Sequence, residues 1–274
     1  MRASYTAGVV VTLIEEGIGF SDVYGISAGC SHSANYISGD IWRARASFVE
    51  FFANRGVAGW GQFLRGNGYF NAEYIYEIAC EPDEKLPFQF DAFMENPAQI
   101  HIEAFEPDTG RTVYWTKADM PTMLDLMKRA RACSTMPVFM KPIEIDGQLC
   151  YDGGIGDSWG IPLAQAKRDG YKKFFIVRTQ KRDYRKTEDK HPGFIKMLLG
   201  KNKAVADRML ERYKHYNAIL DEIDELEARG EAYVFCPHTV LVKNTTLKQP
   251  LLEESFRLGY EQAQSELSAW RSFL

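Results

Sequence analysis

The sequence predicts an α/β fold, and two stretches of the chain support this prediction. In the first stretch, the pattern G-x-S-x-G lies between a strand-like run at 20–24 and a helix-like run at 28–37. In the second, a helix-like run at 161–169 is followed by the buried-strand run Phe-Phe-Ile-Val within 173–178. The order strand, helix, strand indicates a parallel crossover. A chain of 274 residues is long enough for one main domain with a substantial core.

The other periodic runs place helices and strands along the whole chain. Apolar residues three to four positions apart predict helices, and alternating runs predict strands. Helices are expected at 5–16, 41–52, 71–79, 121–133, 202–229 and 251–274. Strands are expected at 100–105 and 111–116, at 139–145 and 148–151 with the turn Asp146-Gly147 between them, and at 233–236 and 239–242. The glycine-punctuated stretch 55–68 is expected to be a loop. The C-terminal part of the chain is therefore predicted to be mostly helical.

Composition narrows the class of protein. The formal net charge of −4 and a pI near 5.8 give no reason to expect a nucleic-acid partner. No apolar run reaches the length of a spanning helix and the N-terminus lacks the layout of a signal peptide, so we expect a cytoplasmic protein, soluble or peripheral to the inner membrane. The five cysteines form no C-x-x-C pair and are interpreted as reduced core residues. Because no metal-ligand spacing is found, neither a metal nor another cofactor is expected.

The G-x-S-x-G pattern makes Ser27 a candidate nucleophile. In a strand-turn-helix elbow the serine occupies a strained backbone conformation at the tip of a sharp turn. Gly25 and Gly29 are expected to relieve the crowding on either side of it. The following helix points its N-terminal amides at the place where an oxyanion would form, and the amide of Ala28 is the first expected donor. An ordinary loop serine is the alternative, because so short a pattern also arises by chance.

Asp152 is the candidate base. It follows a predicted strand and precedes the pair Gly153-Gly154, where glycines allow a sharp turn and leave room for a neighbouring group. A plain Asp-Gly-Gly turn is the alternative. A serine hydrolase ordinarily uses a histidine as its base. None of the five histidines has a recognisable motif around it, although His238 occurs where a third triad member would be placed by chain order. The histidines are His32, His101, His191, His215 and His238.

Taken together, Gly25-Ile26-Ser27-Ala28-Gly29 and the downstream Asp152-Gly153-Gly154 resemble the motifs of the patatin-like phospholipase family. The resemblance extends to about residue 178, and the rest of the chain is similar to the extra C-terminal region of bacterial members. It implies a three-layer α/β/α fold with a mostly parallel central sheet, a catalytic domain at 1–178 and a helical region at 179–274. It also implies a Ser-Asp dyad without histidine, with Ser27 as nucleophile and Asp152 as base, that hydrolyses a phospholipid or another acyl ester through an acyl-enzyme.

The beginning of the chain departs from the family pattern. Residues 1–9 resemble the family's first helix, which follows a glycine-rich loop of the form G-G-G-x-R-G. Arg2 matches the arginine of that loop and Ala3 stands where its last glycine would be, while the three leading glycines and the first strand are absent. Removing one oxyanion donor typically costs about 10²- to 10³-fold in rate. We therefore expect the chain as written to be a poor catalyst.

A second interpretation is a catalytically silent peripheral membrane-binding or regulatory protein with the same fold. Residues 178–203 contain nine Lys or Arg against three Asp or Glu, and the apolar run 192–200 lies among these bases. Such a run is able to dip into the headgroups of an anionic bilayer. A helix that lies on the core with solvated lysines around it is the alternative reading of the same residues.

Overall fold

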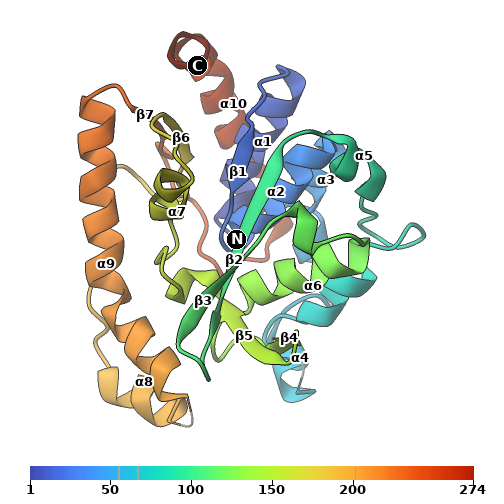
Figure 1. Cartoon of the computed structure of the whole chain (residues 1–274). Coiled ribbons are helices and arrows are strands. Elements are labelled where there is room, and N and C mark those ends of the chain that lie inside the picture. Colours follow the sequence, from blue (N-terminus) through green and yellow to red (C-terminus); the bar gives the residue numbers. More distant parts are fainter. Residues whose placement is uncertain (55, 67, 201) are drawn as a thin grey trace.

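The strands form a main sheet and a separate two-stranded sheet in the computed structural model, which describes residues 1–54, 56–66, 68–200 and 202–274 (Figure 1). The strands are β1 (Asp22–Tyr24), β2 (Gln99–Glu106), β3 (Arg111–Trp115), β4 (Ile143–Ile145), β5 (Gln148–Asp152), β6 (Phe174–Val177) and β7 (Ala232–Phe235). In the main sheet the order is β1-β2-β5-β4, and β3 pairs with β2 outside this path. The second sheet consists of β6 and β7.

Helices cover both sheets, and the C-terminal region is largely helical as predicted (Figure 1). The α-helices are α1 (Ala3–Glu15), α2 (Ala28–Ser38), α3 (Ile41–Ala46), α4 (Trp60–Leu64), α5 (Phe90–Glu95), α6 (Met123–Ser134), α7 (Leu163–Arg168), α8 (Pro192–Leu198), α9 (Lys203–Ala228) and α10 (Gln249–Phe273). Short 3₁₀ turns are η1 (Phe51–Ala53), η3 (Lys117–Asp119) and η4 (Gly153–Ile155), and η2 (Tyr74–Ile78) is a π-helical turn. Of the helices described, none has both the length and the hydropathy needed to cross a bilayer.

The predicted α/β class is confirmed, and the sheets combine parallel and antiparallel pairs. Strand β1 runs parallel to β2, and β6 runs parallel to β7. The pairs β2/β3, β2/β5 and β4/β5 are antiparallel. Asp146 and Gly147 have φ angles of +51° and +79°, which are the left-handed values that a two-residue hairpin turn requires. The hairpin between β4 and β5 therefore forms as the Asp-Gly pair predicts.

The core of the main sheet lies under α2 and α6. Ile100 and Ile102 of β2 pack in one buried cluster with Ala34 of α2 and with Leu126 and Ala130 of α6. Helix α2 directly follows Ser27, and α6 precedes the hairpin that leads to Asp152. Close packing of α2 and α6 against β2 therefore determines where the turns lie.

The N-terminal helix α1 packs against the C-terminal helix α10 at very short range. A Cβ added to Gly8 would lie 2.3 Å from the backbone nitrogen of Tyr260, and one added to Gly259 would lie 2.0 Å from the carbonyl oxygen of Tyr5. Only glycine at both positions permits the two backbones to touch. Chain segments far apart in sequence are thereby joined, with Trp270 fully buried beside them.

The strand predicted at 173–178 forms, but it does not pair with the strand that precedes it in the predicted crossover. Strand β6 does form there, but it pairs with β7 and not with β5, so that α9 lies in the parallel connection. Phe174 of β6 shares a buried cluster with Leu220 and Ile223 of α9, which explains this choice. An apolar run shows that a strand will form, whereas its partner depends on packing far along the chain.

Several boundaries also differ from those predicted. The helix expected at 41–52 ends at Ala46, the one at 71–79 contains the π-helical turn η2, and residues 239–242 form no strand. The expected loop at 55–68 contains the short helix α4, with residues 55 and 67 outside the described part of the chain. Helix α5 was not expected at all. Its apolar spacing covers only six residues, which is too short for periodicity to distinguish a helix from an irregular segment.

Candidate active site

Ser27 occupies the sharp turn between β1 and α2 that the sequence predicts. Its backbone angles are φ +56° and ψ −121°, which is a strained conformation for a residue other than glycine. Just before it, the Gly25 amide donates to the carbonyl of His101 at 3.2 Å and so continues the pairing of β1 with β2. The turn therefore begins where the sheet pairing ends.

The two glycines of the motif have different roles. A Cβ on Gly25 would lie 2.4 Å from the carbonyl oxygen of Gly29 and 2.5 Å from Oγ of Ser33. The turn consequently cannot form with a side chain at position 25. Nothing comparable surrounds Gly29, where an added Cβ would meet open space. The prediction that both glycines relieve crowding is confirmed for Gly25 and wrong for Gly29, because the first turn of α2 projects position 29 away from the packed side.

Cys133 supports the Ser27 turn from the side of α6. The Ser27 amide donates to Sγ of Cys133 at 3.3 Å, and the Cys133 thiol donates to the carbonyl of Gly25 at 3.6 Å. Burial raises the pKa of this thiol, so it stays protonated. The sequence identifies Cys133 only as a buried cysteine of a predicted helix. All five cysteines are buried and free, as predicted.

The amide of Ala28 opens helix α2 directly after Ser27. The next two amides are occupied, because Gly29 donates to the carbonyl of Ile26 and Cys30 donates to the carbonyl of Ser27. Within the residues that the structure describes, the Ala28 amide has no acceptor. An unpaired N–H at the N-terminus of a helix is suited to bind an anionic oxygen. The role of Ala28 as oxyanion donor stays a prediction.

Asp152 ends strand β5 and turns into the pair Gly153-Gly154. The residue is 7% exposed, and one carboxylate oxygen accepts the Gly154 amide at 2.6 Å. Its own amide donates to the carbonyl of Thr135, just past the end of α6, at 2.9 Å. Burial raises the pKa of Asp152, and the Arg212 charge and the hydrogen bonds with Ser27 and Gly154 partly offset this effect. A raised pKa is the direction that a base for an alcohol needs.

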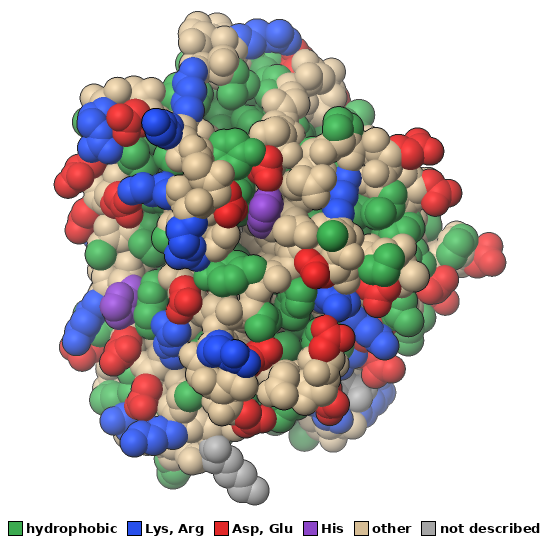
Figure 2. Space-filling view, in the orientation of Figure 1, with side chains coloured by type: hydrophobic (Ala, Val, Ile, Leu, Met, Phe, Trp, Pro, Cys, Tyr) green, Lys and Arg blue, Asp and Glu red, His purple; other side chains and the backbone are tan. Residues whose placement is uncertain are grey.

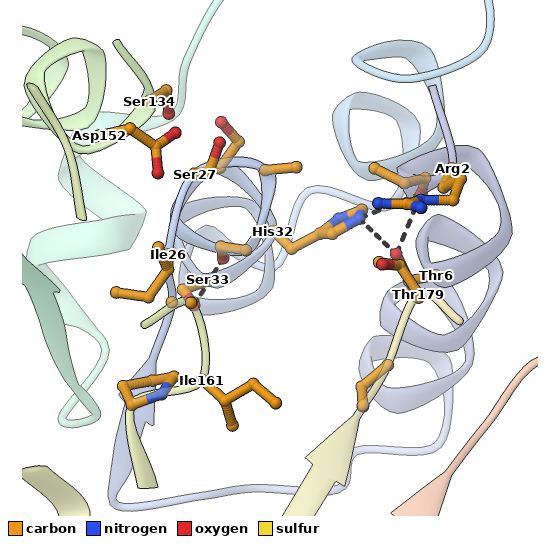
Figure 3. A pocket seen from close by; sticks show the side chains of 18 of the residues that line it. Arg2, Thr6, Ile26, Ser27, His32, Ser33, Ser134, Asp152, Ile161 and Thr179 are labelled. Carbon is orange, nitrogen blue, oxygen red and sulfur yellow. Dashed lines mark hydrogen bonds between the residues drawn. The ribbon is translucent and has the colours of Figure 1, made fainter. Parts of the chain in front are cut away.

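Strands β1 and β5 bring Ser27 and Asp152 to the same place from opposite directions. β1 runs parallel to β2 and ends opposite His101, whereas β5 runs antiparallel to β2 and ends opposite Ala104. Both turns therefore leave the sheet near the middle of β2. Ser27 and Asp152 line one cavity of about 840 Å³ and face each other in it (Figure 3).

The glycines after Asp152 make room for two side chains, the buried Glu103 and the half-buried Arg212. A Cβ on Gly153 would lie 2.5 Å from the carbonyl oxygen of Glu103, and one on Gly156 would lie 2.9 Å from its carboxylate. A Cβ on Gly154 or Gly160 would likewise overlap the guanidinium of Arg212. The sequence predicts that glycines here leave room for a neighbouring group, but it identifies neither neighbour.

Glu103 lies beneath this loop, on β2. The residue is only 2% exposed, and its carboxylate accepts hydrogen bonds from the hydroxyl of Ser158 at 2.5 Å and from the Ser158 amide at 3.3 Å. Burial raises the pKa of Glu103 to about 7. The alternating pattern of its strand gives no signal that one acidic residue points inward.

The histidines are held in other interactions. His32 lines the cavity, but its Nε2 contacts the Thr6 hydroxyl at 2.9 Å and the Ala3 carbonyl at 3.1 Å (Figure 3). Burial lowers the pKa of His32 to about 4. The side chain of His238, the candidate by chain order, is 75% exposed and lies 3.9 Å from Glu266, away from this cavity. The remaining three are His101, which bonds Asp22, His191, which precedes α8, and His215, which stacks on Trp159.

Arg2 lies immediately before α1 and lines the same cavity as Ser27. Its side chain is partly buried, and burial lowers the pKa of its guanidinium. Among the residues described, no group of His, Cys, Asp and Glu side chains is arranged to hold a metal ion. Ser27 and Asp152 thus share the cavity with several basic side chains.

A model of the family described as Patatin-like phospholipase matches residues 1–166, which is more than half of the chain. The chain belongs to the patatin-like phospholipase family. Membership assigns it in general to the lipid acyl hydrolases. A second model, described as a domain of unknown function (DUF6363), matches residues 202–274, which hold α9, β7 and α10. No curated protein matches the chain.

Proposed function

We propose that this patatin-like protein is a serine esterase that cleaves acyl esters of lipids with a Ser27-Asp152 dyad. The observation that carries the proposal is the meeting of a strained serine turn and a buried carboxylate in one cavity. The raised pKa of Asp152 supports its role as base. The histidines lie in other contacts, which supports a dyad rather than a triad.

In the proposed reaction, Oγ of Ser27 attacks the ester carbonyl while its proton passes to the carboxylate of Asp152. The negative charge that develops on the carbonyl oxygen is stabilised by the Ala28 amide and the positive end of α2. Collapse of the intermediate breaks the bond to the leaving alcohol, which takes the proton from Asp152. A water molecule then gives its proton to Asp152 and attacks the acyl-enzyme, and the acid leaves as Ser27 is restored.

The walls of the cavity support a lipid acyl chain as the bound group. They are lined largely by apolar and aromatic side chains from α1, from the segment after α3 and from the segment after α6. Examples are Val10, Phe52, Phe70, Met136 and Met140. Burial of an alkyl chain contributes about 0.8 kcal/mol for each methylene group. A long acyl chain therefore gains binding energy that a short ester does not.

Labelling with a fluorophosphonate probe tests the nucleophile. We expect the probe to modify Ser27 and the Ser27→Ala variant to lose both labelling and hydrolysis of p-nitrophenyl esters. Ser33→Ala is a matched control, because Ser33 lies on α2 with its hydroxyl bonded to the carbonyl of Gly29. Labelling that persists in Ser27→Ala would assign the nucleophile to another residue.

The contribution of a glycine-rich loop to the oxyanion site is tested separately. A version that carries a strand and a glycine-rich loop upstream of residue 1 should hydrolyse p-nitrophenyl esters at least tenfold faster, because the loop would add oxyanion donors. Equal rates for both versions would show that such a loop does not limit the reaction. The comparison uses the same ester concentration and checks both proteins for equal secondary structure.

A peripheral contact with an anionic membrane through residues 178–203 is a second candidate function. The specific observation in its favour is α8, which buries Leu199 at its end but exposes Phe194, Met197 and Leu198 beside Lys196. These exposed side chains would insert among headgroups. The five free thiols support the cytoplasmic side of the inner membrane as the location.

The charge of this segment supports a weaker electrostatic attraction than the sequence count suggests. Arg182 pairs with Glu227, and Arg185 pairs with Asp221 and Asp224 of α9. Figure 2 accordingly shows Lys and Arg side chains interspersed with Asp and Glu side chains on the surface over α9. Sedimentation with anionic liposomes tests the contact: a variant with Phe194→Ser and Met197→Ser should bind about tenfold less, whereas Ser27→Ala should bind like the wild type. Equal binding by the α8 variant would exclude α8 as the contact.

A further inference from the structure

Three of the basic side chains that line the cavity of Ser27 and Asp152 come from separate parts of the chain. Arg2 precedes α1, Lys186 lies between β6 and α8, and Arg212 lies on α9. Lys186 and Arg212 are both outside residues 1–166, which the patatin-like model matches. The cavity that holds the candidate dyad is therefore completed by charged groups from the C-terminal part of the chain.

Arg212 is built into the loop that carries Asp152. Its Nε donates to the carbonyl of Trp159 at 3.3 Å. A Cβ on Gly160 would lie 2.6 Å from a terminal nitrogen of Arg212, and one on Gly154 would lie 2.9 Å from it. The loop thus has glycine at the two positions where the guanidinium lies closest. Such a fit holds the side chain in place even though it reaches the site from a distant helix.

Arg212 and Lys186 lie near the carboxylates of Asp152 and Asp189, respectively, but form no ion pair with them. In the described part of the chain, neither arginine nor Lys186 forms an ion pair, and Nε of Arg2 is buried without any hydrogen-bond partner. Arg43, in the same cavity wall, differs because its guanidinium donates both to the side-chain oxygen of Asn35 and to the carbonyl of Leu86 at 3.2 Å. An orphaned buried nitrogen among unpaired cations is costly unless a ligand supplies the acceptor.

The three positive charges also destabilise one another. Burial lowers the pKa of Lys186, and the charges of Arg212 and Arg2 lower it further, while Asp189 acts in the opposite direction. The pKa of Arg2 is lowered by burial and by Arg212, against the effect of the phenol groups of Tyr184 and Tyr216. An anion bound between them would relieve this repulsion.

We propose that Arg212, Lys186 and Arg2 form a subsite for the phosphate group of an acyl glycerophosphate. The proposal rests on the proposed function, since it places the phosphate next to the ester that Ser27 attacks. Guanidinium groups bind phosphate oxygens through paired hydrogen bonds, and an ammonium group adds a compact charge. In an acyl glycerophosphate the ester and the phosphate belong to one glycerol unit, so both fit in one cavity. Residues outside the patatin-like match thereby select phosphate-bearing esters over neutral acyl glycerols.

Two soluble short-chain esters test this selection without a membrane. Hexanoyl glycerol 3-phosphate and hexanoyl glycerol differ only by the phosphate group, and kcat/KM is measured for each. The wild type should prefer the phosphate ester, and Lys186→Gln should lower the ratio of the two kcat/KM values about tenfold, as expected for the loss of one charge-assisted contact. Lys214→Gln, on the same helix as Arg212 but outside the cavity, should leave the ratio within about twofold.

Two kinetic results would overturn the proposal. One is a wild type without preference for the phosphate ester, and the other is a Lys186→Gln variant that loses the same factor on both esters. Arg212→Gln should lower the ratio as well. Its absolute rates are also expected to change, because Arg212 lies next to Asp152 and affects the pKa of that carboxyl.

A binding measurement separates failure of the subsite from failure of the proposed esterase. A fluorescent acyl glycerophosphate is titrated onto Ser27→Ala, which needs no turnover, and Kd should rise about tenfold when Lys186→Gln is added. An unchanged Kd would overturn the subsite even if the esterase is active. Tight binding that depends on Lys186 would support the subsite even if neither ester is cleaved. Inorganic phosphate should compete only weakly, and competition as strong as that of the lipid would identify a site for free phosphate instead.

Discussion

The Ser27 turn and the Asp152 turn face each other across one cavity, but they are built in different ways. The Ser27 turn packs mainly on its own segment, because Gly25 lies directly on Gly29 and Ser33 a few residues later, while Cys133 supports it from a distant part of the chain. The Asp152 turn packs on residues distant in the sequence, with Glu103 beneath it and Arg212 beside it. A motif that contacts itself is recognisable in the sequence. The neighbours of a motif that contacts distant residues can be identified only from the tertiary structure.

This difference explains why the two turns should respond differently to substitution. Substitutions at the Ser27 turn disturb close contacts between backbone atoms of the same segment, so they should affect folding of the turn as a whole. Changes around Asp152 act on charges held in low-dielectric surroundings, so they should affect protonation and pH dependence. The following predictions test the contrast, beginning with the largest expected effect.

Asp152→Asn should lower kcat/KM for ester hydrolysis by about 10³-fold or more, because an amide cannot accept the serine proton. The double variant with Ser27→Ala should be no worse than Ser27→Ala alone, since the two residues act as a unit. Asp157→Asn is the control, because Asp157 lies on the same loop but pairs with Arg208 near the surface. More than a tenth of the wild-type rate in Asp152→Asn would mean that the base lies elsewhere.

Gly25→Ala should lower the free energy of unfolding by roughly 3 kcal/mol or more, because the added Cβ would overlap backbone atoms that cannot move away. Gly29→Ala is the matched control within the same motif. It should change the free energy of unfolding by less than about 1 kcal/mol, since it meets open space and alanine favours a helix. Urea denaturation measures both. Equal effects would contradict the different roles of the two glycines.

Glu103 should make the protein less stable at alkaline pH. Its pKa is about 7 in the folded protein against an ordinary value of 4.5, so the folded state holds this proton more tightly than the unfolded state. Stability from this group is present below pH 4.5 and is lost as the pH rises to about 7. The loss is at most roughly 3 kcal/mol.

Glu103→Gln should therefore weaken the fall in the free energy of unfolding between pH 5 and pH 8. The amide oxygen of glutamine still accepts the Ser158 hydroxyl but carries no charge to desolvate. Urea titrations at the two pH values provide the measurement. A variant with the same pH dependence as the wild type would show that another group dominates it.

Cys133→Ala should have the smallest effect, a loss of about 1 kcal/mol in the free energy of unfolding, because the Ser27 amide loses a weak sulfur acceptor. It should also slow labelling of Ser27 by a fluorophosphonate several-fold, since the turn is less well held. Cys80→Ala is the control, because Cys80 is also buried but its thiol donates to the carbonyl of Glu77, away from the elbow. Labelling at the same rate in both variants would show that Cys133 does not support the Ser27 turn.

Much of the architecture follows from the sequence because it depends on neighbours along the chain. The helical spacing that predicts α1, α2, α9 and α10 and the Asp146-Gly147 hairpin act over a few residues, and the structure confirms them. The strained Ser27 turn also follows from local spacing. The pairing of β6 with β7 and the open space around Gly29 do not, since each depends on which residues pack nearby in three dimensions.

By itself the sequence determined the α/β class, the elbow at Ser27 and the family to which the chain is similar, since all of these depend on short-range patterns. Only the tertiary structure decided which distant side chains surround Ser27 and Asp152. Glu103 beneath the loop, Cys133 beside the elbow and Arg212 over Gly154 and Gly160 come from β2, α6 and α9. Their contacts form when the sheet and helices pack, and side-chain packing of this kind has no period along the chain that could reveal it in advance.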